Sequence, residues 1–171
     1  MRIGGGAVSI ADVTDREARD LGFVRPFWLN EIRNGRAFSR GERLNASVGD
    51  NGHIQLYNPA GSGITIIVHQ IIYAPIAIDL CYLRAFNTEL TTLRGTGFNL
   101  RAGSGAAVGV TRVQDNAGLL GTGRDEFQFL ARVSRFVVDG WDIELGEGEG
   151  VLMVGNNTNQ DSYCTYRWIE V

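Results

Sequence analysis

The stretch His53–Tyr73, HIQLYNPAGSGITIIVHQIIY, decides the fold class of this chain. Two runs rich in β-branched and aromatic residues flank one break, Asn58–Gly63. Pro59 restricts φ, whereas Gly61 and Gly63 allow positive φ. The break therefore predicts a tight connection between two β-strands.

Further runs with the period-two alternation of strands extend along the chain. The run 126–138 is denser in apolar residues, which indicates either a bend or bulge near Ser134 or two successive strands. The run Ile143–Val154 has a Gly-rich centre and predicts a hairpin. The predicted strands are 52–57, 64–73, 76–86, 106–114, 126–138, 142–145, 151–154 and 163–170.

About eight strands joined by turns and by two longer loops, 87–105 and 115–125, predict an all-β fold. Because no helices alternate with the strands, we expect antiparallel sheets packed as a β-sandwich. A jelly roll is the favoured sandwich, since eight strands is its usual number. An immunoglobulin-like sandwich is the alternative.

The N-terminal region is read as an arm. Thr14–Glu17 forms a capping box that starts a short helix, and Gly22 is a suitable end. A helix of about two turns is unstable alone in water, so we expect it to dock on its own domain or on a partner. The predicted domains are an arm, 1–45, for docking or oligomerisation, and a β-sandwich, 46–171.

Three arginines fall within eight residues near the end of this arm, namely Arg36, Arg40 and Arg43. They are candidates for docking on an acidic surface or on nucleic acid, and the alternative is a solvated segment. The chain as a whole carries a net charge of −3. That charge argues against a nucleic-acid-binding protein.

The composition is that of a globular domain. Of the 171 residues, 44% are hydrophobic and 20% charged, and the 23 glycines are scattered rather than repeated. No run approaches 18 apolar residues and no apolar signal core follows the N-terminus, so we expect no membrane insertion and no secretory signal. The sequence thus predicts a protein made in a cytoplasm-like compartment.

The two cysteines, Cys81 and Cys164, lie inside predicted strands without the spacing of a metal or redox motif. We expect two buried thiols, and whether they pair in a disulfide stays open.

Residues with catalytic potential are few. His53 and His69 lie on either side of the 58–63 break, where a hairpin would bring them close enough for a metal pair. The His-x-His pattern of cupin-type sites is absent, so we expect two strand histidines. The sequence predicts a solvated turn that contains Glu144, Glu147 and Glu149. The alternative is that these carboxylates act in acid–base catalysis or bind calcium. The sequence predicts no enzyme, no cofactor and no metal site.

A second group of residues has the chemistry of sugar recognition. Exposed aromatic rings stack on sugars, and amides and carboxylates hydrogen-bond to hydroxyl groups. Candidates for ligand contact are Trp141, Asn156, Asn157, Asp161 and Tyr163. The alternative is that these residues belong to the core and to turns.

Three segments resemble structural proteins of tailed bacteriophages and phage-derived particles. Val13–Gly22 is similar to an Asp-Arg-x-x-Arg-x-Leu-Gly segment near the start of such proteins. His53–Gly63 resembles their recurring Leu-x-Asn-Pro-x-Gly-Ser-Gly strand and turn. The segments from Gly146 through Val151–Val154 to Trp168–Glu170 resemble their closing strands.

The resemblance implies a homo-oligomeric component of the virion, assembled in the cytoplasm of the bacterial host. A head fibre, head spike or capsid decoration protein is expected, with a tail or collar component as the alternative. The implied partners are further copies of the chain, as a trimer or pentamer, and the major capsid or another virion protein. A host surface glycan is a further possible partner. The implied docking residues in the arm are Asp15, Arg16, Arg19, Leu21 and Gly22, and Glu17 departs from the pattern because small residues are commoner there.

Overall fold

The computed structural model describes residues 26–77, 79–121, 125–131 and 135–171. These residues form one short helix, α2 (Pro26–Arg33), and eleven strands. The strands are β1 (Ala37–Asn45), β2 (Asn51–Tyr57), β3 (Ile66–Pro75), β4 (Asp79–Ala85), β5 (Thr92–Thr96), β6 (Phe98–Asn99), β7 (Val110–Asn116), β8 (Asp125–Ala131), β9 (Phe136–Leu145), β10 (Gly150–Gly155) and β11 (Asp161–Glu170).

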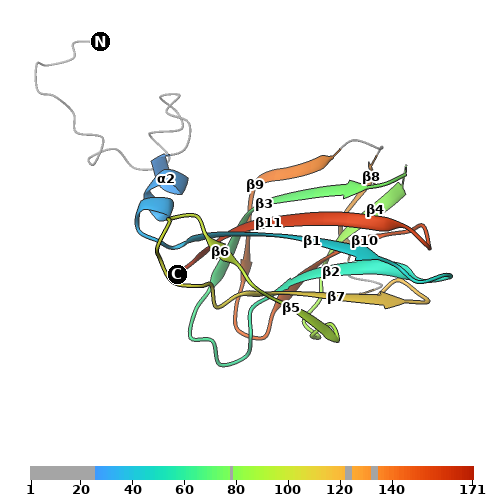
Figure 1. Ribbon diagram of the computed structural model, residues 1–171, viewed down its shortest axis with the longest axis horizontal. Helices are drawn as coiled ribbons and strands as arrows, with labels where there is room; N and C mark the ends of the chain where they lie inside the picture. The colour runs from blue at the N-terminus through green and yellow to red at the C-terminus, as the bar shows by residue number, and fades with distance from the viewer. Residues whose placement is uncertain (1–25, 78, 122–124, 132–134) are drawn as a thin grey trace, which may run out of the picture.

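The strands form two sheets that pack face to face (Figure 1). Sheet A has the order β6-β1-β11-β3-β9, and sheet B has the order β5-β7-β2-β10-β4-β8. All the pairs are antiparallel. The prediction of an all-β antiparallel sandwich is confirmed.

Strands early in the chain pair with strands late in the chain. β1 pairs with β11, β2 with β10, β3 with β9, and β4 with β8. β5, β6 and β7 fall between β4 and β8 in sequence and extend both sheets on one side. Most of the contacts that hold the fold are therefore distant in sequence.

One hydrophobic core fills the space between the sheets, and β11 shows how the sequence builds it. Cys164, Tyr166 and Trp168 alternate along the strand and point into the core. The indole of Trp168 lies so close to the backbone at Gly97 that a Cβ there would come within 2.3 Å of the ring. The sandwich therefore needs glycine at position 97.

The tight connection at 58–63 does not close a hairpin. β2 lies in sheet B and β3 in sheet A, so the turn carries the chain from one sheet to the other. The predicted hairpin within Ile143–Val154 is wrong for the same reason, because β9 and β10 belong to different sheets. The alternation of apolar and polar residues shows which side chains share a face of a strand, but it does not determine which other strand pairs with it.

Asn58 ties these two crossings together. Its buried side-chain amide donates to the carbonyl oxygens of Ile64 (2.9 Å) and Leu145 (3.1 Å). Its backbone N–H donates to the carbonyl of Glu149 (2.9 Å). In the opposite direction, the Glu147 carboxylate accepts the N–H groups of Gly61 and Gly63, so the two turns brace each other at one end of the sandwich.

The boundary of the predicted arm needs correction. Residues 37–45 form β1, which pairs with β11 over nine positions and belongs to the sandwich. The helix α2 was not predicted, although Pro26 is a favoured first residue of a helix. The predicted helix near 14–21 lies outside the described residues.

Two other expectations changed. The segment 87–105, expected to be a loop, contains the short strands β5 and β6. The run 126–138, which is rich in apolar residues, belongs to two successive strands, β8 and β9. This is the second of the two predicted alternatives, the first being a bend or bulge near Ser134.

Candidate functional site: the open face of sheet A

The outer face of sheet B is covered by loops of the same chain, and the polar side chains of β2 hold that cover in place. Gln55 is fully buried. Its amide donates to the carbonyls of Phe86 (2.8 Å) and Thr88 (3.0 Å), and its own oxygen accepts the N–H of Leu90 (3.1 Å). One side chain thus satisfies three backbone groups of the loop that follows β4.

His53 performs the same task for a second loop. Its Nδ1 lies 3.2 Å from the carbonyl oxygen of Gln114, and its Nε2 accepts the N–H of Leu120 at 3.0 Å. These partners assign the neutral ring with the proton on Nδ1. Burial lowers the pKa of His53, because the charged ring would lose its hydration.

Arg84 adds a third anchor on this face. Its guanidinium stacks over the ring of Tyr82 at 4.4 Å and donates to the carbonyl of Leu120 at 2.8 Å. Leu90, in the loop after β4, is 1% exposed. Over β2, the outer face of sheet B is therefore an internal surface of this molecule, whereas Leu130 on the edge strand β8 stays 58% exposed.

Among the described residues, α2 covers the outer face of sheet A at one end (Figure 1). Trp28 of the helix stacks on His69, with ring centres 4.8 Å apart and planes at 19°. Beside this stack, His69 Nδ1 lies 3.2 Å from Asp142 and Nε2 lies 3.9 Å from Asp139. Ile169, on the strand between β1 and β3, is fully buried although it lies outside the core cluster.

The two histidines do not meet. His53 lies on sheet B and His69 on sheet A, where a register shift between Val68 and Gln70 makes it the extra residue of a bulge. Within the described part of the chain, no three His, Cys, Asp or Glu side chains gather as a metal site would need. The idea of a histidine metal pair rested on the hairpin, and it fails with the hairpin.

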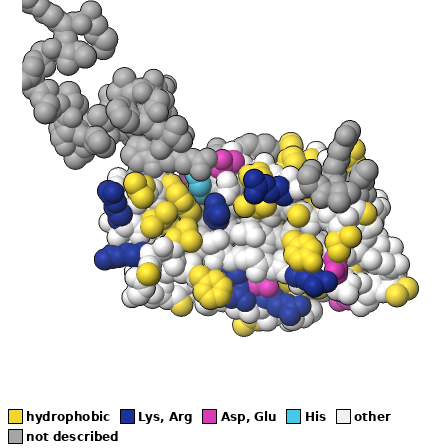
Figure 2. Space-filling view, turned by 45° about the horizontal axis from the view of Figure 1, so that its top comes forward, with side chains coloured by type: hydrophobic (Ala, Val, Ile, Leu, Met, Phe, Trp, Pro, Cys, Tyr) yellow, Lys and Arg dark blue, Asp and Glu magenta, His cyan; other side chains and the backbone are white. Residues whose placement is uncertain are grey.

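Beyond α2, no other described segment lies over the outer face of sheet A. Gly41, Thr165, Ile72 and Val137 form one row across β1, β11, β3 and β9. Val137 is 39% exposed, and Tyr163 in the next row is 41% exposed. Figure 2 shows this side of the molecule, with separate hydrophobic clusters, arginines and the single visible histidine.

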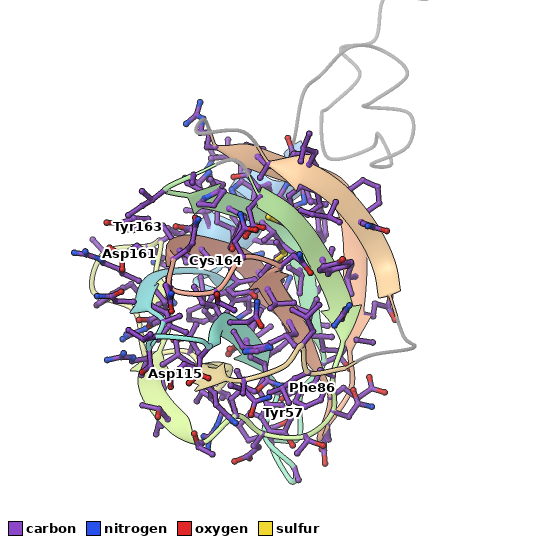
Figure 3. All side chains as sticks on the ribbon, turned by 90° about the vertical axis from the view of Figure 1, so that its right-hand side faces the viewer. Tyr57, Phe86, Asp115, Asp161, Tyr163 and Cys164 are labelled. Atoms are coloured by element: carbon purple, nitrogen blue, oxygen red, sulfur yellow. The ribbon has the colours of Figure 1, made fainter. Side chains whose placement is uncertain are left out.

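Arg43, Asp161 and Tyr163 form a polar cluster at the end of this face. Arg43 pairs with the Asp161 carboxylate, and its guanidinium carbon lies 5.4 Å from the centre of the Tyr163 ring. Figure 3 shows Tyr163 and Asp161 on the outer side of β11, while Cys164 lies deeper among the side chains. The sequence predicted Arg43 for docking and the other two for ligand contact, and the structure brings all three together.

The other two arginines of the predicted docking set are engaged within the molecule. Arg36 pairs with the buried carboxylate of Glu31 at 2.7 Å. Arg40 pairs with Glu42 and donates to the carbonyls of Thr96 and Arg94, each at 2.8 Å. Asp15, Arg16, Arg19, Leu21 and Gly22 lie outside the described residues.

The remaining ligand candidates are dispersed. Asn156 and Asn157 lie in the loop between β10 and β11, where the N–H of Asn157 donates to Asp79 at 2.9 Å. The Asn156 carbonyl accepts the Asn51 amide at 2.8 Å. Trp141 belongs to β9, but its side chain lies outside the described part.

The two cysteines are buried and unpaired. Burial raises the pKa of Cys81 to about 12 and raises that of Cys164 as well. Such thiols are protonated at neutral pH and behave as small hydrophobic groups.

Comparison with known proteins adds no identification: no protein-family model, no curated protein and no solved structure matches the chain. In the described ranges, none of the helical structure is long and apolar enough to span a membrane.

Proposed function

We propose that this chain is a non-enzymatic structural component of a phage particle, of the head fibre, head spike or decoration type. It docks on the particle through its N-terminal arm and self-associates through its β-sandwich. The particle assembles in the cytoplasm of a bacterial host, and the docking partner is the major capsid or another virion protein. A tail or collar position is the alternative within the same class.

We infer that the sandwich is a jelly roll, the type found in viral capsid proteins. A jelly roll of eight strands corresponds to one long antiparallel ribbon that is folded over. The first strand therefore pairs with the last, the second with the one before the last, and so on inward. The pairs β1–β11, β2–β10, β3–β9 and β4–β8 follow this scheme. In this interpretation, β5, β6 and β7 are an insertion between the fourth and fifth strands.

The buried polar side chains are hydrogen-bonded to backbone groups of the same chain, which supports a structural role. His53, Gln55 and Asn58 are fully buried, and each bonds to backbone groups that hold loops and turns. Asp79 accepts the backbone N–H of Asn157. Side chains used in this way stabilise the fold and are not presented to a substrate.

The observation that carries the proposal is the contrast between the two outer faces. Over its central strands, the face of sheet B is closed by the chain's own loops, whereas the described residues leave the face and edges of sheet A open beyond α2. Sheet edges with unpaired backbone groups favour association with another chain. A sandwich with one closed and one open side is suited to packing beside its neighbours on a particle.

The arm is tested with a variant lacking residues 1–25, which retains β1 and every other described element. The full chain and this variant are each produced in host cells in which the particle assembles. We expect the full chain to co-purify with the particle, while the variant unfolds at the same temperature but stays out of it. Incorporation of the variant at the full level would remove the docking role of the arm, and absence of the full chain from particles would overturn the proposed function.

A glycan- or host-receptor-binding module is the second candidate, and the exposed ring of Tyr163 beside Arg43 and Asp161 favours it. Binding to an array of bacterial surface glycans tests it. Tyr163→Ala should abolish binding, and Thr165→Ala on the same strand serves as the matched control. No binding by the unmodified chain at millimolar sugar would remove this function.

A further inference from the structure

We propose that copies of this chain join head to tail through the two edges of sheet A, the β9 edge of one copy meeting the β1 edge of the next. This inference rests on the self-association in the proposed function and names the surfaces that perform it. It follows from the open edges, their opposite charges and the direction of their strands.

In the described part of the chain, both edges of sheet A lack a partner strand over much of their length. Among the described strands, β9 ends sheet A and pairs only with β3. At the other side, β6 pairs with β1 only at Phe38 and Ser39, so residues 40–45 have a described neighbour on one side alone, β11. That open stretch of six residues is about 20 Å long at the rise of an extended strand.

The β9 edge is acidic. Asp139, Asp142 and Glu144 all lie on this strand and are partly or largely exposed. Arg135 precedes the strand. Charged side chains on an edge strand discourage pairing with an identical edge, so this edge is unsuited to meeting its own copy.

The β1 edge is rich in arginine. Six arginines lie on β1 or near it, in α2, the link from α2 to β1, β5 and the residues after β6. Three acids, Glu31, Glu42 and Asp161, pair with three of them, and two of the others, Arg33 and Arg101, lie at the β6 end of this edge. The six are Arg33, Arg36, Arg40, Arg43, Arg94 and Arg101. The excess of positive charge complements the acidic β9 edge of a second copy.

The strand directions allow the sheet to continue across the junction. Three antiparallel steps separate β1 from β9, through β11 and β3. The two edge strands therefore run in opposite directions. A second copy in the same orientation presents its β1 antiparallel to β9 of the first, which is the pairing that forms an antiparallel ladder.

Sheet B leaves space for such a strand. It extends beyond β2 by two further strands, β7 and β5, whereas sheet A opposes this extension only with the two-residue β6. Arg40 and Glu42 of β1 reach across to this ledge, where Glu42 accepts the Thr111 hydroxyl at 2.6 Å. A β9 strand from a neighbour would lie above the ledge and complete the shorter sheet.

Such a junction joins two different surfaces, and contacts of this kind generate rings when the rotation closes and filaments when it does not. A closed ring would fit the trimer or pentamer expected for this protein. The partner at each junction is a second copy of the chain.

The chain contains no lysine, which gives a direct test. Arg43→Lys places one side-chain amine at the β1 edge and keeps its charge. A zero-length carbodiimide, which joins an amine to a carboxylate in contact with it, is then applied to the full chain mixed with isotope-labelled copies. We expect covalent dimers and higher species in which position 43 is linked to Asp139, Asp142 or Glu144 of another copy. The link to Asp161 of the same chain is the internal positive control.

Charge variants give an independent readout, the mass of the protein in solution by light scattering. Glu144→Arg should raise the dissociation constant about tenfold or more, and high salt should weaken the unmodified assembly. Arg167→Glu makes a charge change of equal size and opposite sign in the middle of the outer face of sheet A and should leave the mass unchanged. Thermal unfolding of each variant checks that the fold is intact.

The outcomes separate the inference from the function on which it rests. An assembled protein whose cross-links avoid β9, or which dissociates with Arg167→Glu but not with Glu144→Arg, would overturn the assigned edges and leave self-association standing. A protein that stays monomeric at high concentration would overturn both.

Discussion

The two outer faces of this sandwich begin from similar strand patterns and end in opposite states. On sheet B, the alternate residues of β2 are polar, as on a solvated face, yet Asn51, His53 and Gln55 are buried beneath loops. On sheet A, Tyr163 and Val137 occupy outward positions and stay substantially exposed. The difference shows that an outward polar residue in a strand can serve the backbone of a covering loop rather than water.

The largest effect is expected where the cover of sheet B is anchored. Gln55→Ala leaves the buried N–H of Leu90 and two part-buried carbonyl groups without their partner, and a buried group costs about 1–3 kcal/mol when water cannot replace the bond. We expect the free energy of unfolding to fall by about 3–4 kcal/mol in chemical denaturation. Gln128→Ala, an exposed glutamine on β8, is the matched control and should change it by less than about 0.5 kcal/mol. Equal effects would mean that the cover contributes nothing.

The next largest loss of stability is expected from an apolar side chain in the loop that covers sheet B. Leu90→Ala removes a side chain that is 1% exposed and should cost about 2–3 kcal/mol of unfolding free energy. Leu130→Ala, at a leucine that is 58% exposed on β8, should cost less than about 0.5 kcal/mol. Equal losses would mean that the loop covers Leu90 no better than solvent-exposed Leu130 is covered on the edge strand of the same face.

The pH dependence of stability should report on His53. Because its pKa is lowered in the folded state, the unfolded chain takes up the proton first as the pH falls below about 6.5. The contribution of His53 to the free energy of unfolding is complete above that pH and decreases as the pH falls from 7 to 5.5, by at most about 1 kcal/mol.

His53→Gln keeps an acceptor oxygen near the position of Nε2 and has no proton to gain, so its thermal midpoint should change less over this interval. A variant that loses as much stability as the unmodified protein would assign the effect to other groups.

The smallest effect is expected on sheet A. Trp28→Ala removes the stack on His69, which is worth about 0.5–1.5 kcal/mol beyond the buried area. We expect faster amide hydrogen exchange in α2 and a small loss of global stability. Unchanged exchange in the helix would show that Trp28 does not hold it to the sheet.

Several elements were predictable because their signals are local. The strands 51–57, 66–75 and 161–170 were found within two residues at each end, since β-branched and aromatic residues alternate there. The strand β1 was missed, because its arginines and a glycine hide the alternation of Phe38 and Leu44. The expected site residues Arg43, Asp161 and Tyr163 did meet, but no spacing in the sequence revealed that β1 and β11 are neighbours.

The sequence by itself determined that this protein is built of antiparallel strands and where its chain turns. Pro59, Gly61 and Gly63 restrict or free their own backbone angles, and a period of two needs no distant partner. Only the tertiary structure decided which strands pair, which turns cross between the sheets, and which polar side chains are buried. Those choices depend on contacts between residues far apart in the chain, such as Asn58 with Leu145 and Gln55 with Leu90, whose energy exists only once both sheets have formed.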